Sequence, residues 1–520
     1  MRKTIQLLFL FFFTYLFLRT HYPLTSWIPV DLFLRADPLI ALTALLSSKE
    51  ITTHFIPAMI LIVLTLLFGR FFCGYLCPLG TLIEVSRRLL PAPEVRHPEK
   101  LRVVKFYLLM VIVIASTTGA QLAFLFDPTV ILTRTYTILL SPLIILVANF
   151  SLEGIRPLAD HLGLITLAYL HYFQPLFYTT LSTGAIFISI IALNLITPRF
   201  WCRYLCPLGA LVSLCSRVGI FKRMVDKSCT YCMKCTHQCP MGAIEEDPTK
   251  VKVRECIQCR TCTLVCPQKV VSFKPHYAPF HEDLHTELGI TRRGFLCSLS
   301  GGLISSFLLY NSPLKRGRGD TLIRPPGALP EEAFLNTCIR CSACMKVCIT
   351  NTLQPSLFEG GLEGLWTPRA DLRRAACEQS CNLCGKVCPT HAIRDLDPEE
   401  KKHAKIGTAV LLKEKCLVWE QDKVCLICDE QCPYNAIVFK TVEGLRRPFV
   451  IENKCNGCGF CEQKCPVEGD AAIVVKPLGE IRLKEGSYRK EAELKSLKLT
   501  EDSGYDRFLF ENESGKEVNE

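Results

Sequence analysis

Cysteines are the residues in this sequence whose number and spacing point most directly to chemistry. Two runs in the middle of the chain, residues 229–240 and 256–267, both read CxxCxxCxxxCP. With this spacing, three cysteines of one run and the fourth cysteine of the other hold each [4Fe-4S] cluster, because a tight loop can present only three converging thiolates. The spacing therefore predicts two clusters, one on Cys229, Cys232, Cys235 and Cys266, the other on Cys256, Cys259, Cys262 and Cys239.

Zinc and disulfides are the alternative uses of so many cysteines. Structural zinc sites usually combine two CxxC pairs, which a quartet closed by proline fits poorly. Disulfide scaffolds are typical of small secreted chains, whereas this chain has 520 residues and 30 cysteines. Cys215 and Cys297 stand outside every motif, and we interpret them as apolar fillers.

Four more quartets follow between residues 325 and 475. Their members are Cys338, Cys341, Cys344 and Cys348; Cys377, Cys381, Cys384 and Cys388; Cys416, Cys425, Cys428 and Cys432; and Cys455, Cys458, Cys461 and Cys465. The first is closed by Ile349 in place of proline, and the second and third have a longer first gap that a loop insertion explains. They predict four further clusters, but spacing leaves open whether neighbouring runs pair or the first pairs with the last.

A second repeat carries two cysteines in each copy. FFCGYLCPLGTL at residues 71–82 matches FWCRYLCPLGAL at residues 200–211 at most positions. The candidate catalytic residues are the four cysteines of these CxxxCP motifs, Cys73, Cys77, Cys202 and Cys206. They could hold a further cluster, since four thiolates suffice; they could cycle between dithiol and disulfide, since cysteines at i and i+4 share a helix face; or they could be structural.

The first 200 residues supply the elements that must position these motifs. Their apolar runs and the mean hydropathy of +0.25 indicate an integral membrane protein. The expected helices cover about residues 5–18, 55–72, 104–125 and 178–196, with a short re-entrant or interfacial piece at 38–46 and a helical pair or surface-lying segment within 128–178. Lys and Arg gather beside these spans, which places residues 216–290 in the cytoplasm.

A second membrane crossing is predicted after the first two cluster runs. Thr291-Arg292-Arg293-Gly294-Phe295-Leu296 begins an apolar run that ends at Tyr310. This pattern resembles a twin-arginine export signal, and the alternative is an ordinary transmembrane helix. Either one carries residues 313–520 to the periplasmic side, and because no small-residue cleavage site follows, we expect an uncleaved anchor.

Other ligands are excluded by missing patterns. The net charge of +11 is concentrated beside the hydrophobic spans, so it does not indicate nucleic acid. The sequence has no CxxCH motif for heme c and no GxGxxG or P-loop signature for a nucleotide.

Residues 1 to about 275 resemble NapH, the membrane protein of the periplasmic nitrate reductase system, in their helical hairpins ending in CxxxCP and the two runs that follow. Residues 291 to about 475 resemble NapG and MauM, in the twin-arginine stretch, RPPGALP at 324–330, VCPTHAI at 387–393 and IGTAV at 406–410. The chain looks like a fusion of the two. The resemblance implies a quinol dehydrogenase that passes electrons from the membrane quinone pool to a periplasmic reductase or c-type cytochrome.

We therefore expect an α-helical membrane domain with α+β ferredoxin-like [4Fe-4S] domains, multi-pass in a bacterial or archaeal cytoplasmic membrane, with six [4Fe-4S] clusters and menaquinone or another quinone as substrate. The expected domains are 1–215, NapH-like and transmembrane; 216–275, a two-cluster ferredoxin; 276–290, a linker; 291–312, the anchor; 313–480, a four-cluster ferredoxin; and 481–520, a charged and partly disordered tail.

Clusters on opposite sides of a hydrocarbon layer about 30 Å thick cannot exchange electrons directly. We expect a quinone, oxidised near the CxxxCP motifs, to connect them. Arg70, Tyr75, Glu84 and Arg203 could serve the quinone or its protons, or could anchor helix ends. Two other functions fit the same motifs: a maturation factor that reduces a metal centre or thiol of a client enzyme, and an adaptor from ferredoxin to quinone with every cluster in the cytoplasm.

Overall fold

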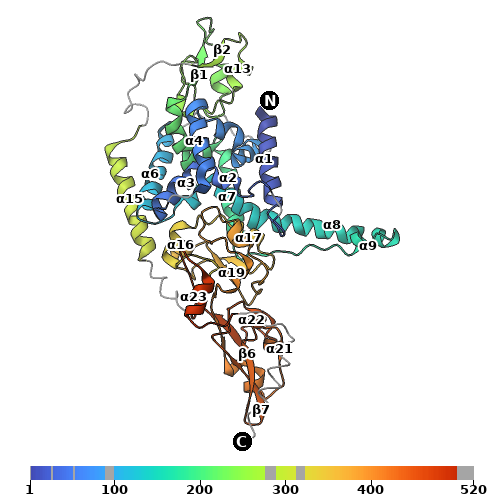
Figure 1. The fold of residues 1–520 in the computed structure, drawn as a ribbon. Helices are drawn as coiled ribbons and strands as arrows, with labels where there is room; N and C mark the ends of the chain where they lie inside the picture. The colour runs from blue at the N-terminus through green and yellow to red at the C-terminus, as the bar shows by residue number, and fades with distance from the viewer. Residues whose placement is uncertain are drawn as a thin grey trace. The chain divides into compact units, whose positions relative to one another are not determined.

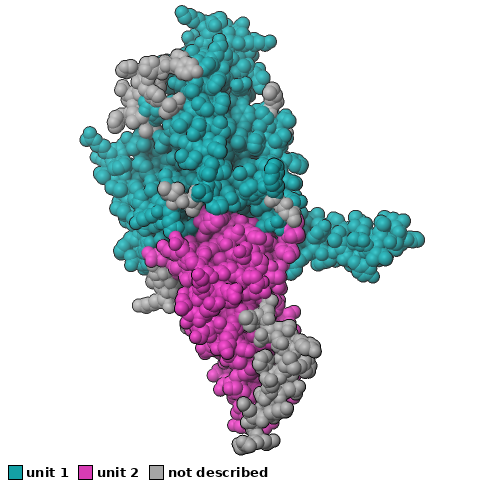
Figure 2. Space-filling view, viewed as in Figure 1, with its two compact units in different colours: residues 1–20, 24–311, 336–343 teal, residues 21–23, 312–335, 344–520 magenta. Residues whose placement is uncertain are grey.

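A computed structural model describes residues 2–24, 27–50, 53–87, 99–275, 289–311 and 322–499. The chain forms two compact units (Figure 2). Unit 1 comprises residues 1–20, 24–311 and 336–343, and unit 2 comprises residues 21–23, 312–335 and 344–520. Most of the expected linker at 276–290 and residues 500–520 of the expected tail lie outside the described residues.

Unit 1 is built from apolar helices close to the expected positions (Figure 1). They are α1 (Arg2–Leu18), α3 (Pro38–Ser48), α4 (Ile56–Phe68), α6 (Val104–Thr117), α7 (Pro128–Thr135), α8 (Ser141–His161) and α10 (Thr180–Ala192). Helix α6 ends at Thr117 rather than near residue 125, because Gly119 follows with φ +92° and turns the chain.

Helical length and hydropathy bear on the expected membrane spans. In the described part of the chain, one continuous helix, Pro128–His161, is long and apolar enough to cross a membrane by length and composition. Three shorter apolar helices are Pro38–Ser48, Thr53–Phe68 and Thr180–Leu195. Residues 128–178, expected as a helical pair or a surface segment, thus contain one long helix followed by the short α9 (Ile165–Ala168).

The CxxxCP repeat has a common local structure in both copies. A π-helical turn, η2 (Phe72–Leu76) or η7 (Trp201–Leu205), leads into a nine-residue helix, α5 (Pro78–Ser86) or α11 (Pro207–Cys215). In each copy the second cysteine caps that helix and proline occupies its first position, where the missing N–H is not needed. Both copies pack into the same apolar core.

Residues 221–275 of unit 1 form a small cysteine-rich segment closed by one hairpin-like sheet. Strand β1 (Phe221–Val225) pairs antiparallel with β2 (Val271–Pro275), so the segment begins and ends side by side. Between the strands lie the short helices α12 (Lys234–His237) and α13 (Thr261–Val265), each within one of the two cysteine runs. The segment lies at one end of the helices of unit 1 (Figure 1).

Helix α15 (Arg292–Tyr310) packs along α6 and runs parallel to it. Gly294 lies against Tyr107 near the start of α6, Gly302 against Ile114, and Thr118 donates a hydrogen bond to Ser306 Oγ at 2.6 Å beyond its end. A Cβ on Gly302 would come within 2.8 Å of Ile114, so the small residue permits the close approach. The twin-arginine segment is therefore a packed helix of unit 1.

Unit 2 consists of short strand pairs and short helices around its cysteines. Its sheets are β3 (Leu353–Pro355) with β4 (Pro368–Ala370), β5 (Thr408–Leu411) with β8 (Ile473–Lys476), and β6 (Ile437–Val442) with β7 (Leu445–Val450). Each of the four cysteine runs contains one short helix: α17 (Ala343–Val347), α18 (Leu383–Lys386), α21 (Ile427–Glu430) and α22 (Phe460–Lys464). Helix α16 (Glu331–Thr337) precedes the first run, and α19 (Pro398–Lys402) lies between the second and the third.

Residues 481–499 are more ordered than expected from their charge. They include α23 (Tyr488–Leu494), in which Tyr488 and Ala492 are fully buried. Arg482 forms an ion pair with Glu331 at 2.7 Å, which ties this segment back to the start of unit 2. These two buried residues lie four positions apart on one face of the helix, and the many charged residues around them made this apolar face difficult to recognise in the sequence.

Candidate iron-sulfur sites

The cysteines of residues 221–275 line two cavities in the predicted crossed arrangement. Site I is lined by Cys229, Cys232, Cys235 and Cys266. Site II is lined by Cys239, Cys256, Cys259 and Cys262. Arg223 of β1 lines both cavities and donates a hydrogen bond from Nη2 to Cys235 Sγ at 3.6 Å.

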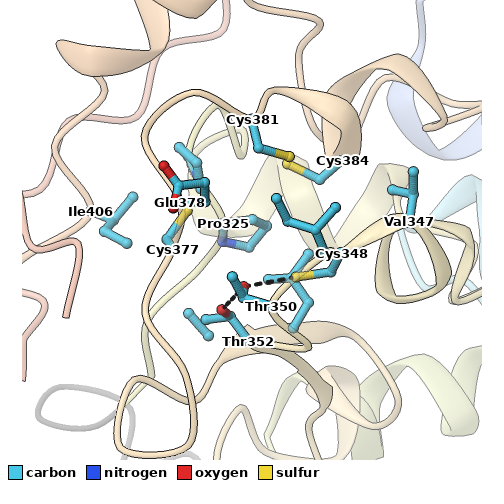
Figure 3. Close-up of a pocket in the computed structure, with 14 residues that line it drawn as sticks. Pro325, Val347, Cys348, Thr350, Thr352, Cys377, Glu378, Cys381, Cys384 and Ile406 are labelled. Atoms are coloured by element: carbon cyan, nitrogen blue, oxygen red, sulfur yellow. Dashed lines mark hydrogen bonds between the residues drawn. The ribbon is translucent and has the colours of Figure 1, made fainter. Parts of the chain in front are cut away.

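Unit 2 repeats this crossed arrangement between neighbouring runs. Site III combines Cys377, Cys381 and Cys384 with Cys348 of the preceding run, as Figure 3 shows. Site V combines Cys455, Cys458 and Cys461 with Cys432. Site IV is the reciprocal set: Cys416, Cys425 and Cys465 pack in one apolar cluster, and Cys428 interacts with Cys416 and Cys425. The first run therefore pairs with the second and the third with the fourth, which resolves the alternative that spacing left open.

Backbone geometry explains how three thiols of one run point inward. In four of the six runs, the second residue after the first cysteine and the first residue after the second cysteine have positive φ. These residues are Tyr231 and Met233, Gln258 and Arg260, Arg340 and Ser342, and Gly457 and Gly459. The two runs with a longer first gap lack this pair. Sequence reasoning missed the pattern, since only the last run signals it with glycine.

The donor sets fit a multinuclear cluster better than a single ion. A zinc ion with Zn–S bonds near 2.3 Å would hold its sulfurs about 3.8 Å apart. Among the described residues, no three His, Cys, Asp or Glu side chains are grouped so that they could hold one metal ion. Backbone N–H groups also reach the sulfurs, with Ala243 N 3.3 Å from Cys239 Sγ and Ala436 N 3.3 Å from Cys432 Sγ. Such bonds stabilise thiolates and tune cluster potentials.

The CxxxCP cysteines lie beside site II. Cys73 and Cys202 pack against Met241, Ala243 and Ile257, the apolar residues that also contact Cys239, Cys256 and Cys259. Gly74 is pressed against this segment, because a Cβ there would lie 2.4 Å from Ile257 O. All four CxxxCP cysteines belong to, or pack on, the same core of unit 1. The structure thus brings together the two repeats that the sequence presents separately.

The four polar residues considered for quinone or proton chemistry are engaged around this contact. Arg70 Nη1 donates to Arg254 O at 2.8 Å, Tyr75 Oη to Gln258 O at 2.9 Å, and Arg203 Nη2 to Pro240 O at 2.7 Å. Glu84 lies on the other side of the motifs, 2.8 Å from Arg199 Nε. Arg70, Tyr75 and Arg203 therefore hold the cysteine-rich segment and the CxxxCP turns together.

A further repeat, the dipeptide Asp-Pro, was not recognised from the sequence. Asp37 and Asp127 each cap the helix that follows, and Thr129 Oγ1 lies 3.0 Å from Asp37 Oδ2 and 2.7 Å from Asp127 Oδ1. Both carboxyl groups are fully buried. The matching DPLI and DPTV tetrapeptides before apolar runs were the available signal.

A segment with two further cysteines contacts the chain just beyond the C-terminus of α6. Residues 336–343 belong to unit 1 and include Cys338 and Cys341. Arg340 Nη1 donates to Gln121 O at 2.6 Å, and Ser47 Oγ donates to Asn336 O at 2.7 Å, both beyond the C-terminus of α6. At its N-terminus, Arg102 Nη2 donates to Gly242 O at 2.6 Å in the site II segment. The 14 residues of α6 span about 21 Å between these two ends.

Comparison with known families agrees with these sites. A 4Fe-4S binding domain model matches residues 52–93 and 179–226, which hold the two CxxxCP motifs; a 4Fe-4S dicluster domain model matches residues 228–271; and a further 4Fe-4S binding domain model matches residues 448–468.

Curated relatives match a large part of their own length. The methylamine utilization ferredoxin-type protein MauM of Methylorubrum extorquens is 36% identical over 209 residues, which is 38% of this chain and 90% of the relative. The ferredoxin-type protein NapG of Escherichia coli is 36% identical over 202 residues, 36% of this chain and 86% of the relative. NapF of the same species is 31% identical over 152 residues, 29% of this chain and 84% of the relative. No solved structure matches the chain.

The repeated four-cysteine sites and the matching domains define an iron-sulfur electron-transfer protein of the ferredoxin type. Within this class, the chain belongs to the ferredoxin-type family that includes MauM and NapG.

Proposed function

We propose that this chain is a fused, membrane-bound electron-transfer unit that oxidises menaquinol and passes the electrons to a periplasmic reductase or c-type cytochrome. The observation that carries the proposal is the placement of cysteine-bearing segments at the two ends of α6 in unit 1. A protein that only exchanged electrons between soluble partners would not need apolar helices between its cysteines.

The surface of unit 1 supports a lipid environment. Leu146, Val147 and Phe150 of α8 and Leu181 of α10 are more than half exposed, and neighbouring residues of these helices are apolar as well. Contiguous exposed apolar surface on this scale is typical of membrane contact. The parallel packing of α15 on α6 takes the chain from Arg292 at the end of site II to Tyr310 at the other end, and Arg292 and Arg293 then lie on the cytoplasmic side as the positive-inside rule expects.

Six clusters follow from the crossed-ligand rule. Sites I to V account for 20 cysteines in five sets. The remaining cysteines of the first two runs between residues 325 and 475 give the sequence enough thiols for a sixth cluster. When bound, the clusters accept and release single electrons, while the chain supplies burial, N–H donors to sulfur and the order of the sites.

Anaerobic titration of the purified chain with a menaquinol analogue tests the function. Bleaching of the cluster absorbance is expected, and a variant in which Gly74→Leu separates the CxxxCP turn from Ile257 should bleach more slowly. If menaquinol leaves the clusters oxidised while dithionite reduces them, quinol oxidation is ruled out and reduction of a client metal centre or thiol becomes the better interpretation.

Protease treatment of intact spheroplasts tests the topology. Trypsin should cleave at the exposed Arg489 and Lys490 of unit 2 from outside. The exposed Lys227 and Lys269 of the site I segment should be cut only in inverted vesicles. Protection of Arg489 and Lys490 in spheroplasts would instead place all clusters in the cytoplasm.

A further inference from the structure

We propose that Asp37 and Asp127 form a buried proton site in unit 1, which holds one proton between its two carboxyl groups and accepts a second when quinol is oxidised. The shared proton concerns only these two side chains. The second proton rests on the proposed function, because it comes from quinol. The cysteine motifs carry electrons, and a quinol that gives up its electrons must also give up its protons to some group.

The two carboxyl groups lie at the start of two buried helices and share one hydroxyl group. Asp37 caps α3, with its Oδ1 accepting from Leu39 N at 2.9 Å, and Asp127 caps α7, with its Oδ1 accepting from Val130 N at 3.0 Å. Thr129 Oγ1 lies between them, 3.0 Å from Asp37 Oδ2 and 2.7 Å from Asp127 Oδ1. Both aspartates are fully buried.

The hydrogen bonds of this cluster require one more proton than the side chains supply when both carboxyl groups are ionised. Thr129 has a single hydroxyl proton for its two carboxyl neighbours, so at one of them a carboxyl O–H must be the donor. The Asp127 side chain also hydrogen-bonds Asp37 directly, and Asp127 Oδ2 has no donor within the described part of the chain. Two carboxylates can only accept, so a hydrogen bond between them needs a proton. Two adjacent buried carboxyl groups therefore share one.

Helix capping alone does not explain the pair. Capping uses only the Oδ1 atoms, and asparagine or serine would cap equally well without a charge. The tripeptide Asp-Pro-Thr recurs at residues 247–249, where Asp247 Oδ1 accepts from Thr249 N at 2.9 Å and from Thr249 Oγ1 at 2.6 Å. That copy lies in a partly exposed turn. The copy at residues 127–129 differs by its burial and by the second carboxyl group, and buried ionisable groups among apolar helices are typical of proton pathways.

Neither carboxyl group has a cation among its strongest interactions, which are with the other carboxyl group, Thr129 and backbone N–H groups. Several charged or titratable groups lie on the elements packed against α3 and α7, which include α2 (Leu32–Arg35) and η5 (Tyr136–Leu140). They are Arg35, Glu84, Lys105, Tyr107, Arg134, Tyr136 and Cys215, with Cys77 and Cys206 at the N-caps of α5 and α11. Arg35 pairs with Asp31, Lys105 with Glu255 and Glu84 with Arg199. Without a counter-ion, the pair is more stable with a proton than without one.

The pair lies beside the CxxxCP turns, where we expect quinol to be oxidised. Helix α5 packs against α7 and α11 against α3, and Asp37 interacts electrostatically with Cys77. Buried polar side chains continue from the pair along α3: Gln121 Nε2 donates to Thr43 O at 3.1 Å, and Ser47 Oγ donates to Asn336 O at 2.7 Å. The ten residues from Asp37 to Ser47 span about 15 Å. These groups provide a route for the proton toward the C-terminal end of α6.

Protons and electrons balance in each one-electron step. The O–H bond of the quinol breaks, its electron passes to an iron-sulfur cluster, and its proton forms a new O–H bond on the ionised carboxyl group of the pair. The pair is then neutral and returns to its singly protonated form when this proton leaves along α3. Two such steps convert one quinol to quinone.

Infrared spectroscopy of the full chain, labelled with 13C-aspartate, tests the shared proton. At pH 7 the spectrum should contain the C=O band of a protonated aspartic acid, although an ordinary aspartate ionises near about pH 4. Asp37→Asn and Asp127→Asn retain the helix caps, and each should remove the band, because the amide N–H donates to the remaining carboxylate. Asp247→Asn is the matched control and should keep it. Absence of the band from the unaltered chain overturns the proposal however the variants fold, and so does a band that both variants retain.

Stopped-flow reduction of the clusters by a menaquinol analogue tests the second proton. Asp37→Asn should slow reduction by quinol at least about tenfold and leave reduction by dithionite unchanged, since dithionite delivers electrons without a proton. Asp247→Asn should change neither rate. Equal quinol rates in Asp37→Asn and the unaltered chain overturn the role as proton acceptor. If quinol reduces no cluster even in the unaltered chain, the proposed function fails, while the infrared band still decides whether the pair shares a proton.

Discussion

Arg70 Nη1 lies 3.1 Å from Glu255 Oε2, and this ion pair joins the turn before the first CxxxCP motif to the loop before site II. Lys105 Nζ contacts the other carboxylate oxygen of Glu255 at 2.5 Å. All three side chains are at most 8% exposed. Burial alone would raise the pKa of Glu255, but Lys105 and Arg70 outweigh it and hold the pKa below its usual value. The carboxylate is thus a charged link between the helices and the cysteine-rich segment.

Glu255→Gln should loosen this link. It leaves two buried cations short of a counter-charge, which costs about 3 kcal/mol and corresponds to a roughly 100-fold larger open population. Hydrogen exchange of the amides of residues 253–262 should accelerate accordingly. Glu99→Gln is the control, because the Glu99–Lys252 pair is two-thirds exposed at Glu99 and contributes less than about 1 kcal/mol. Equal effects of the two substitutions would contradict the structural role of Glu255.

The crossed arrangement of the ligands predicts which cluster's paramagnetic resonance signal each cysteine substitution should alter. Cys266→Ser should alter the paramagnetic signal that Cys229→Ser also alters, and Cys239→Ser the signal that Cys256→Ser alters. Within unit 2, Cys348→Ser should affect the cluster of Cys377 and spare that of its own run. Grouping of the spectra by run, rather than across runs, would show that the pairing is wrong.

Arg223 should raise the reduction potentials of sites I and II. Its buried guanidinium lines both cavities and donates to Cys235 Sγ, so it stabilises the extra electron of a reduced cluster. Arg223→Gln should lower both midpoint potentials by tens of millivolts, since about 59 mV corresponds to 1.4 kcal/mol for one electron. Arg223→Lys, which retains the charge, should shift them less. Redox titration followed by paramagnetic resonance makes the measurement, and unchanged potentials in Arg223→Gln would refute it.

Glu331 should stabilise unit 2 across the neutral range. Burial raises the pKa of its carboxyl group, but the guanidinium groups of Arg324 and Arg482, at 2.6 and 2.7 Å, lower it to about 2. Because the folded-state pKa lies below the unfolded value near 4.3, the contribution is complete above about pH 4.5 and is lost as the pH falls toward 2. Glu331→Gln should therefore cost about 2 kcal/mol at pH 7, a figure reduced for a side chain that is one-quarter exposed.

Urea unfolding at two pH values checks this prediction. The difference between the wild type and Glu331→Gln should be the same at pH 7 and pH 5.5, because both lie above the titration of the carboxylate. Glu493→Gln, which removes a surface pair with Arg489 at 3.4 Å, should change stability by less than about 0.5 kcal/mol. A difference that shrinks between pH 7 and pH 5.5 would mean that another group carries the effect.

The spacing of the cysteines was sufficient to predict which three cysteines of a run lie together, because these residues belong to one short loop. The assignments of Cys239 and Cys266 to opposite sites needed only the repeat, and the cavities have that composition. Which runs pair in unit 2 depends on how the chain folds back between them, for example between Cys348 and Cys377, and the spacing of the cysteines carries no information about that. Helix ends were missed for a similar reason: Gly119 ends α6 through its backbone angle, which hydropathy does not register.

The contact between the CxxxCP motifs and site II was also beyond the sequence. It depends on Gly74 fitting against Ile257 O and on single ion pairs such as Lys105–Glu255, which join residues far apart in the chain. Hydrophobic periodicity reports which face of an element is buried but not against which partner. Glu255 itself lies in a polar stretch, VKVRECIQC, where a buried carboxylate has no distinguishing mark.

Because neighbouring runs exchange their fourth cysteines, cluster insertion must follow the synthesis of both runs. Site I includes Cys266, the last cysteine of its segment, and site II includes Cys239 from the earlier run, so the β1–β2 segment cannot complete site I until translation has passed β2. Iron delivery must therefore follow synthesis of the whole segment, and a ribosome stalled between the runs would leave the four thiols of the first run without a complete ligand set and exposed to oxidation.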